Sequence, residues 1–507
     1  MTTCPNILLI TSDQQHWDTL GVSNPRISTP SLDRLCREGT RFTRAYCPNP
    51  VCSPTRASII TGQYPSLHGC WTIGVKLPED VPTVGEALSA NGYHTSLIGK
   101  AHFQPTASRP GSESLEAQPT VRDLDFWRGF GGPWYGFDHI ELARNHADES
   151  HVGQHYAIWM EEHGLTNWRD YFQPVSPEEK RNAPRRQHHW DLPEQFHYTT
   201  WTGERTIAQI AESAATDTPF FCWASFHDPH PPYLVSEPWA SMYKAEDMEP
   251  GELTPGEHDT NPPTFGLTQQ QRPDFSPWKE EFGSHGFQSH LHQREKLQKD
   301  IAIYYGMISF IDDQVGRILH RLDELGLAEN TIVVYSTDHG HFIGQHGLIA
   351  KGAFHYEDMI RLPFIVRYPG VVPAGAESDA LQSLVDLAPT FLHYAGIPIP
   401  GIMQGVDQHA AWEGAADETK VRSWAIVENR HQPTRLHLRT YVDQRYKITV
   451  YREATYGELF DLVDDPGEIR NRWDDPAYAD RKRDLLLQFM QADIAREPTR
   501  MPRIAGA

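Results

Sequence analysis

Two short apolar segments of the chain each lead into an acidic residue that is followed by a polar one. The segments span residues 6–11 and 331–336. The four residues in question are Asp13, Gln14, Asp338 and His339. Neither segment alternates apolar with polar residues, which is typical of parallel strands buried on both faces of a sheet. Because side chains at the carboxyl ends of such strands meet in one crevice, the sequence predicts that these four converge.

Two further segments continue this pattern. Residues 219–224 form another short apolar run and predict a third buried strand. Residues 297–327 carry apolar side chains at roughly 3.6-residue spacing, which predicts a long helix packed on the core. Buried strands combined with amphipathic helices predict a fold of the α/β class.

The character of the chain changes after residue 400. Short alternating runs such as 446–451 predict antiparallel strands, and we expect a final helix over about 477–496. A chain of 507 residues also exceeds the size of one ordinary hydrophobic core. We therefore expect a catalytic domain over residues 1–400 and a smaller α+β subdomain over residues 401–507.

Two long segments interrupt the α/β pattern, near residues 105–201 and 234–292. Both are rich in Trp, His, Pro, Gln and acidic residues, and six of the 14 tryptophans lie in the first. This aromatic content argues against disordered linkers, because disordered segments are poor in aromatic residues. Long irregular segments in compact domains are usually functional, so we interpret both as insertions that roof the active site.

The charge balance limits the partners of this chain. Its 45 Lys and Arg against 67 Asp and Glu give a formal net charge of −22, which opposes binding to nucleic acid. A local cluster of cations with a metal can still attract a small anionic substrate. No segment approaches the roughly 18 to 20 apolar residues of a membrane span, and the N-terminus lacks a basic secretory region. We therefore expect a cytoplasmic protein without membrane contact.

The most specific chemical pattern lies at residues 51–62, where Cys52, Pro54 and Arg56 occupy alternate positions ahead of Thr-Gly. A chain of this composition would contain about 0.04 Cys-x-Pro-x-Arg patterns by chance, so a merely structural cysteine is the weaker interpretation. The other five cysteines are scattered without the CxxC pairs of zinc sites, and we expect reduced thiols. Since proline suits a first helical turn, Arg56 is expected one turn beyond Cys52.

This segment resembles the signature of the type I sulfatases, which belong to the alkaline phosphatase superfamily. The resemblance implies that a formylglycine-generating enzyme oxidises Cys52 to formylglycine, whose aldehyde hydrate becomes the nucleophile. It also implies an alkaline-phosphatase-like fold, in which helices flank a large mixed sheet. A thiol nucleophile at Cys52 would instead require a depressed pKa and a partnering base.

The two Asp-containing pairs form a set of mainly oxygen ligands for a hard divalent cation. A single Asp at a strand end is more often a helix cap, but two such pairs beside the cysteine pattern favour a metal site. The resemblance places calcium on Asp13, Asp338 and the oxidised Cys52. Gln14 and His339 depart from the Asp and Asn common in the family. Because they lower the charge and add a nitrogen ligand, manganese becomes an alternative to calcium.

Three further motifs match the family. Gly-Lys-x-His at residues 99–102 resembles the element whose lysine holds a sulfate oxygen and whose histidine contacts the formylglycine hydrate, which implies these roles for Lys100 and His102. His230, in a Pro-His-Pro-Pro turn, is the candidate general acid for the leaving group. Lys351 resembles the second substrate lysine, which would stabilise developing negative charge. Taken singly, each of these residues would more often be a solvated loop or turn residue.

Together these patterns predict a metal-dependent, arylsulfatase-like sulfuric ester hydrolase acting on a small sulfate ester. The closest alternative is a phosphonate monoester or phosphodiester hydrolase, whose nucleophile is the same and whose Asp-Gln and Asp-His metal set is similar. Lys100 and His102 favour the sulfatase. A third interpretation is a noncatalytic anion- or glycan-binding protein. The choice among aryl, sugar and choline sulfates and the oligomeric state are left open.

Overall fold

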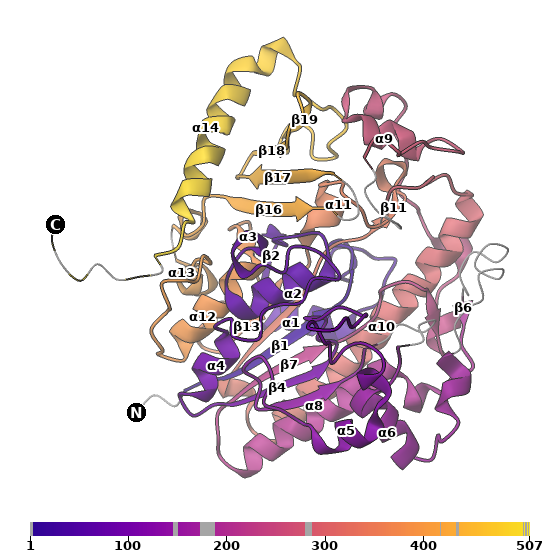
Figure 1. Ribbon diagram of the computed structural model, residues 1–507, viewed down its shortest axis with the longest axis vertical. Helices are drawn as coiled ribbons and strands as arrows, with labels where there is room; N and C mark the ends of the chain where they lie inside the picture. Colours follow the sequence, from indigo (N-terminus) through magenta and orange to yellow (C-terminus); the bar gives the residue numbers. More distant parts are fainter. Residues whose placement is uncertain are drawn as a thin grey trace.

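The computed structural model describes residues 4–144, 151–172, 188–278, 286–415, 417–431 and 435–499, with the single residues 501, 504 and 506. Two larger sheets organise these residues (Figure 1), and three small sheets of two or three strands accompany them. A large sheet with helices on both faces holds most of the chain, and a four-stranded antiparallel sheet with one long helix follows it near the C-terminus. This arrangement confirms the predicted mixed α/β fold and its C-terminal subdomain.

The large sheet has eight strands in the order β14-β2-β13-β9-β1-β7-β4-β5. Its strands are β1 (Asn6–Ser12), β2 (Thr40–Phe42), β4 (His94–Gly99), β5 (His139–Leu142), β7 (Phe220–Ser225), β9 (Thr331–Thr337), β13 (Ile365–Arg367) and β14 (Ala376–Ser378). The central strands pair in parallel, whereas β13 runs antiparallel to both of its neighbours. The sheet is therefore mixed.

The register of the central strands aligns their carboxyl ends. Thr11 of β1 pairs with Ser336 of β9 on one side and with Ser225 of β7 on the other. Gly99, the last residue of β4, pairs with Ser225. The loops that follow β1, β4, β7 and β9 therefore leave one edge of the sheet together, as expected for a site in an open α/β fold.

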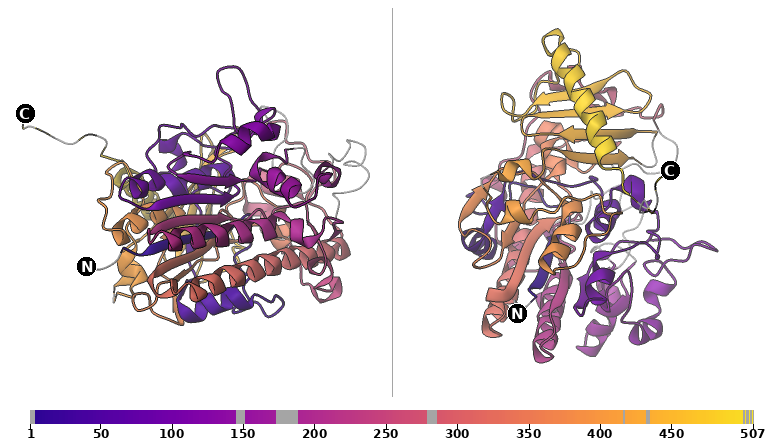
Figure 2. Two further views of the ribbon diagram at one scale, coloured as in Figure 1. Left: turned by 90° about the horizontal axis from the view of Figure 1, so that it is seen from below. Right: turned by 90° about the vertical axis from the view of Figure 1, so that its left-hand side faces the viewer.

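Both faces of the large sheet are apolar, which explains why its central strands do not alternate. Leu8 and Ile10 of β1 pack in a cluster with α1 (Pro30–Glu38), α8 (Tyr198–Ala215) and α10 (Arg294–Glu324). On the opposite face, the cluster contains side chains of α2 (Cys52–Thr61), α4 (Val84–Ser89) and α12 (Leu387–Tyr394). Figure 2 shows these helical layers above and below the strands. The long helix predicted over 297–327 is α10.

The C-terminal sheet is antiparallel, as the alternating pattern predicted. Its strands are β16 (Ala425–Arg430), β17 (His437–Val442), β18 (Tyr446–Tyr451) and β19 (Gly457–Asp461). The predicted final helix is α14 (Ala479–Ala495), which lies along one face of this sheet (Figure 2). Ile426, Ile448 and Leu459 from the strands form one cluster with Leu485 and Phe489 of α14.

Short elements complete the fold. They are β3 (Ala45–Tyr46), α3 (Pro65–His68), α5 (Leu124–Gly129), α6 (Gln154–Glu162), β6 (His188–His189), β8 (Leu234–Val235), α9 (Pro263–Thr268), β10 (Phe342–Ile343), β11 (Ile349–Ala350), α11 (Glu357–Ile360), β12 (Arg361–Leu362), β15 (Gln382–Ser383) and α13 (His409–Trp412). None of the helices in the described ranges is both long and apolar enough to cross a membrane.

The segments expected to be insertions are folded onto the core where the structure describes them. All six tryptophans of the first segment are buried: Trp127, Trp134, Trp159, Trp168, Trp190 and Trp201. The first segment also includes the start of α8, a core helix of the large sheet. Residues 145–150, 173–187 and 279–285 of the two segments lie outside the described residues.

Candidate active site

Helix α2 places Cys52 at its first position. Val51 adopts an extended conformation before it, and Gly62 ends the helix with φ 62°, donating its N–H to the carbonyl of Ser58. This left-handed conformation suits glycine. Every residue of α2 is buried, so Cys52 sits at a helix N-terminus inside the protein.

Residues from two strand ends and one loop surround the sulfur atom of Cys52. Sγ lies 3.2 Å from Nε2 of His339, 3.6 Å from Oδ1 of Asp13 and 3.5 Å from Nζ of Lys351. Asp13 follows β1 and His339 follows β9, so the sheet delivers them to one place. The structure therefore brings together residues that the sequence holds far apart.

The surroundings of Cys52 keep its thiol protonated. Burial and the carboxylate of Asp13 raise the pKa of Cys52 to about 11, although Lys351 and Lys100 act against this shift. Thiol catalysis requires the thiolate, which is a minor species at neutral pH when the pKa is this high. The geometry thus argues against an unmodified Cys52 as the nucleophile.

Arg56 lies one turn beyond Cys52 and is fully buried. Its Nε donates to Oδ2 of Asp338 at 2.9 Å, and its Nη1 donates to the carbonyl oxygen of Lys100 at 2.9 Å. Nη1 also donates to Oγ of Ser225 at 2.7 Å. Three strand ends, those of β9, β4 and β7, are therefore joined to α2 by one guanidinium group.

Lys100 follows β4 and forms a buried ion pair with Asp13. Its approach depends on Gly99, whose φ is 105° and where a Cβ would lie 2.0 Å from the carbonyl oxygen of Ser225. Ser225 was missed by the sequence interpretation, yet its hydroxyl donates to the carbonyl oxygen of Lys100 at 2.6 Å. The available signal was a polar residue directly after the apolar run at 219–224.

Asp13, Cys52, Asp338 and His339 form a cluster suited to a metal ion, because their ligand atoms all lie within 4.8 Å of one another. All four side chains are buried. Nδ1 of His339 donates to the carbonyl of Gly340 at 3.0 Å, which leaves Nε2 directed at Cys52. Burial lowers the pKa of His339 to about 4, so the imidazole is neutral, as a ligand must be.

Gln14 contacts this cluster through its backbone. Its backbone N–H donates to Oδ1 of Asp338 at 3.0 Å, and its side-chain amide donates to Nδ1 of His341 at 2.7 Å. Its Oε1 is buried and has no hydrogen-bond partner among the described residues. A buried carbonyl oxygen without a hydrogen-bond partner, on a residue that follows Asp13 and binds Asp338 through its backbone, fits a hard cation, because such an atom is costly to bury unless something binds it.

His230 and Lys351 lie together beside Cys52. Nδ1 of His230 donates to the carbonyl of Pro231 at 2.6 Å, and Nε2 lies 3.1 Å from Nζ of Lys351. Nε2 therefore accepts a hydrogen bond from the ammonium group. Burial, together with the positive charge of Lys351, holds the pKa of His230 well below its ordinary value, so His230 is neutral before substrate binds.

His102 is also buried, and its backbone has a left-handed φ of 57°. Neither ring nitrogen has a hydrogen-bond partner in the described part of the chain, so its imidazole makes no hydrogen bond to Cys52. Burial, followed by the charge of Arg144, holds its pKa well below the ordinary value. His102 is thus a neutral imidazole with both nitrogens available.

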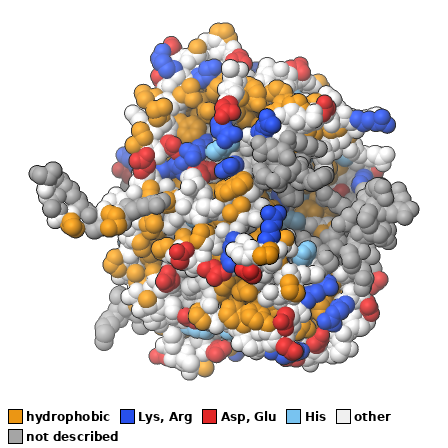
Figure 3. Space-filling model, in the orientation of Figure 1, with side chains coloured by type: hydrophobic (Ala, Val, Ile, Leu, Met, Phe, Trp, Pro, Cys, Tyr) orange, Lys and Arg blue, Asp and Glu red, His pale blue; other side chains and the backbone are white. Residues whose placement is uncertain are grey.

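The charges around Cys52 favour an anionic ligand despite the acidity of the whole chain. Arg56, Lys100 and Lys351 supply three positive charges against the two negative charges of Asp13 and Asp338, and a bound divalent cation would add two more. Basic and histidine side chains also gather in the middle of the face shown in Figure 3, below the C-terminal sheet. Such local fields attract anions even when the net charge is negative.

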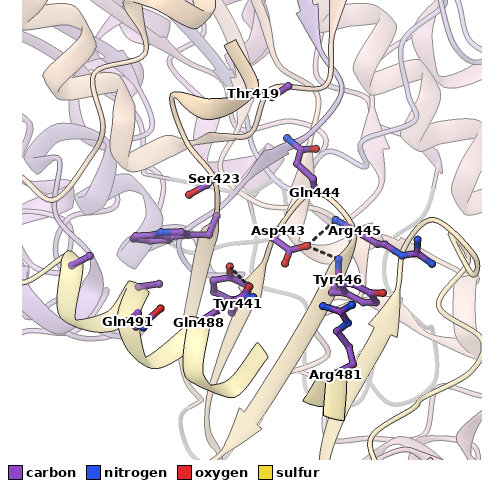
Figure 4. Close-up of a pocket in the computed structure, with 13 residues that line it drawn as sticks. Thr419, Ser423, Tyr441, Asp443, Gln444, Arg445, Tyr446, Arg481, Gln488 and Gln491 are labelled. Atoms are coloured by element: carbon purple, nitrogen blue, oxygen red, sulfur yellow. Dashed lines mark hydrogen bonds between the residues drawn. The ribbon is translucent and has the colours of Figure 1, made fainter. Parts of the chain in front are cut away.

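A cavity of about 630 Å³ lies elsewhere, between the C-terminal sheet and α14 (Figure 4). Trp424, Tyr441 and Tyr446 line it, together with Arg481 and Gln488. None of the predicted site residues does. The volume of a surface cavity therefore does not locate the chemistry here, which depends on buried polar groups.

The family model described as Sulfatase matches residues 5–397. The chain belongs to the sulfatase family. A second model, described as N-sulphoglucosamine sulphohydrolase, C-terminal, matches residues 344–494 of this sulfatase. The two models together span both sheets.

Two curated relatives are similar to the chain along most of its length. The sulfatase is 29% identical to the uncharacterized sulfatase YidJ of Escherichia coli K12 over 98% of its own length and 88% of the relative. It is 28% identical to the multifunctional alkaline phosphatase superfamily protein PehA of Trinickia caryophylli, covering 94% of its own length and 93% of that protein.

Among solved structures, the phosphonate monoester hydrolase of Agrobacterium radiobacter shares the fold of this sulfatase. The TM-score is 0.77 at 23% identity, and the match covers 98% of this chain and 97% of that one. The structural comparison thus confirms an alkaline-phosphatase-like fold.

Proposed function

We propose that this sulfatase family member hydrolyses sulfate monoesters, using a formylglycine derived from Cys52 and one divalent cation. The observation that carries the proposal is the group of cations around the N-terminus of α2. Lys351 lies 3.5 Å from the Cys52 sulfur, Arg56 is one turn away, and Lys100 pairs with the Asp13 carboxylate that also faces this sulfur. Such a site favours transfer of an anionic group to residue 52.

Formylglycine at position 52 would supply an aldehyde hydrate, one hydroxyl of which attacks while the second later expels sulfate. The high pKa of the Cys52 thiol supports this modification over direct thiol catalysis. Maturation then requires a formylglycine-generating enzyme as a partner. The chain's own contribution is position, because α2 and the strand ends hold residue 52 in a buried, polar site.

Asp13, Asp338, His339, Gln14 and the oxidised residue 52 would hold the cation. When bound, the ion supplies positive charge that polarises an oxygen ligand and neutralises charge on the transferring group. The carboxylates and the Gln14 carbonyl favour calcium, and the His339 nitrogen keeps manganese as an alternative.

Departure of the alcohol requires a proton, for which His230 is the proposed donor. Without substrate its Nε2 is unprotonated and accepts a hydrogen bond from Lys351. A bound sulfate ester adds negative charge beside both side chains, which raises the pKa of His230 toward its ordinary range. Protonation of His230 is therefore coupled to the arrival of an anionic substrate.

Phosphonate monoester hydrolysis is the second candidate. The high fold similarity to the Agrobacterium enzyme and the Asp-Gln and Asp-His metal set favour it. The buried pair of Lys100 with Asp13 favours sulfate, because a second cation beside the metal suits a group with its charge spread over several oxygens. We place sulfate first and phosphonate as a side activity.

A parallel kinetic assay tests the proposal. The matured enzyme would be assayed on an aryl sulfate and on an aryl phosphonate monoester with the same leaving group, with Cys52→Ala as the control. A higher kcat/KM for sulfate that is lost in the variant supports the proposal, and a higher value for phosphonate supports the alternative. Full activity of Cys52→Ala would overturn both.

Mass spectrometry of the Cys52 peptide completes the test. After expression with a maturation enzyme, an aldehyde at residue 52 is expected. An unmodified thiol together with no turnover of either ester would favour a noncatalytic anion-binding protein.

A further inference from the structure

We propose that Glu116 is a positioning residue for His102, acting from the long segment after β4 that the sequence predicted to be an insertion. The inference rests on the proposed function, in which the family resemblance implies that His102 contacts the formylglycine hydrate at residue 52. It adds a residue that none of the sequence motifs contains.

The carboxylate of Glu116 accepts two backbone hydrogen bonds from residues 102–104, the loop that carries His102. Oε1 accepts the N–H of His102 at 2.8 Å, and Oε2 accepts the N–H of Gln104 at 2.8 Å. Glu116 is 1% exposed, so these bonds lie inside the protein. A carboxylate with both oxygens engaged by one loop fixes the orientation of that loop.

The conformation of His102 explains why such a clamp is needed. Its φ of 57° lies in the left-handed region, which is unfavourable for a residue other than glycine. The imidazole makes no hydrogen bond of its own with any described residue, so its side chain contributes no polar contact that would hold the loop. The backbone bonds to Glu116 therefore maintain this strained conformation.

The segment carrying Glu116 is itself tied to the loop. The N–H of Leu115 donates to Oε1 of Gln104 at 2.8 Å, and Oγ of Ser114 donates to the carbonyl of Pro105 at 2.6 Å. Residues 114–116 thus run alongside residues 102–105. This segment therefore contacts the loop that carries His102 directly. That contact is separate from the predicted role of the segment as a roof over the active site.

Neighbouring groups compensate part of the cost of burying the charge of Glu116. Burial raises its pKa, while Arg144 and the amides of Gln104, His102 and Phe103 act in the opposite direction. Arg144 also acts on the imidazole of His102. The positive charge of Arg144 thus offsets part of the cost of burying the carboxylate that holds the loop.

A double-mutant cycle with Glu116→Gln and His102→Ala tests the proposal. The amide keeps one acceptor but turns its NH₂ group toward the second backbone N–H, so the clamp opens on one side. Glu116→Gln is expected to lower kcat about 10- to 100-fold while KM changes less, because a displaced His102 imidazole stabilises the transition state less well. In the His102→Ala background the same change should cost less than about 3-fold, since its effect acts through His102.

Glu113→Gln is the matched control, because Glu113 lies in the same segment but is exposed. It should behave like the wild type. Equal fold-losses from Glu116→Gln in both backgrounds would overturn the proposal, because they would indicate a role independent of His102. An unchanged kcat in Glu116→Gln would also overturn it.

Hydrogen–deuterium exchange supplies a readout that does not depend on activity. Faster exchange at the amides of residues 102–104 in Glu116→Gln is expected, with unchanged exchange in the strands of the large sheet. Unchanged exchange at these amides would overturn the clamp. If Glu116→Gln does not fold, Glu116→Asp, which keeps the charge but is shorter by one methylene, takes its place with the same expectations.

The failure of this proposal is distinguishable from failure of the proposed function. If the wild type hydrolyses only the phosphonate monoester, the sulfatase proposal fails and the cycle is measured on the phosphonate. If it hydrolyses neither ester, the exchange measurement alone decides whether Glu116 holds the loop.

Discussion

The Nε atom of Arg56 lies 2.9 Å from Oδ2 of Asp338, and both side chains are fully buried. This pair connects α2, which carries Cys52, to the end of β9, which carries the proposed metal ligands. A buried charge without its partner is strongly destabilising, so the pair couples the stability of the site to its chemistry.

Arg56→Lys should damage both stability and activity. Lysine keeps the charge but cannot donate at once to Asp338, Ser225 and the carbonyl oxygen of Lys100. We expect the free energy of unfolding to fall by about 2–4 kcal/mol and kcat/KM to fall about 100-fold, as measured by urea unfolding and steady-state kinetics. The exposed Arg109→Lys is the control, and wild-type behaviour of Arg56→Lys would contradict the prediction.

Removal of the metal should lower thermal stability and abolish activity, because the positive charge that the cation adds beside the buried carboxylates of Asp13 and Asp338 is lost. A free metal concentration of 100 times its Kd stabilises a protein by about 2.7 kcal/mol. We therefore expect Tm to fall on dialysis against a chelator and to recover with Ca²⁺ or Mn²⁺. Asp338→Asn should lose this response, while the exposed Asp80→Asn should keep it. An unchanged Tm of the wild type with and without added metal would argue against the proposed metal site.

His339→Asn should shift the metal preference toward calcium. The substitution replaces a nitrogen ligand by an amide oxygen, and oxygen ligands favour calcium over transition metals. Titration calorimetry of the metal-free protein with Ca²⁺ and with Mn²⁺ measures the ratio of the two affinities. An unchanged ratio would mean that His339 does not ligate the ion.

Alkaline pH should weaken the fold through His346. Burial lowers its pKa, but hydrogen bonds to Asp358 and Glu257 outweigh burial and raise it to about 9. Its Nδ1 lies 2.7 Å from Oε1 of Glu257, and its Nε2 lies 3.4 Å from Oδ2 of Asp358.

Because the folded pKa exceeds the unfolded value near 6.5, this stabilisation is complete below pH 6.5 and is lost as the pH rises through about 9. Its size is on the order of 3 kcal/mol. Urea unfolding between pH 6 and pH 10 should show this loss in the wild type, and much less of it in His346→Gln. The exposed His320→Gln should follow the wild type, and parallel curves for all three proteins would refute the assignment.

The strands that carry the site were predictable because they are buried on both faces. Residues 6–11 and 331–336 could be identified without knowing which strands they pair with, because a short unbroken apolar run by itself indicates a strand buried on both faces. The helix α10 was equally clear from its spacing. By contrast, the reversed direction of β13 depends on pairing with β2 and β9, which no local pattern encodes.

The same division applies to the site residues. Cys52 and Arg56 were predicted from their spacing on one helix, and Asp13 and Asp338 from their places after strands. Glu116 was missed, because its partners are backbone amides in a loop, and such contacts leave no periodicity and no motif in the sequence.

The sequence alone determined the α/β class, the C-terminal subdomain and the residue types that meet at Cys52. Apolar periodicity indicates which segments are buried, and short motifs indicate which side chains carry the chemistry. The tertiary structure alone decided that the Cys52 thiol is protonated, that Gln14 presents an unpaired oxygen and that Glu116 holds the His102 loop. These properties arise from distances between distant segments and from the exclusion of water, and both exist only after the chain has packed.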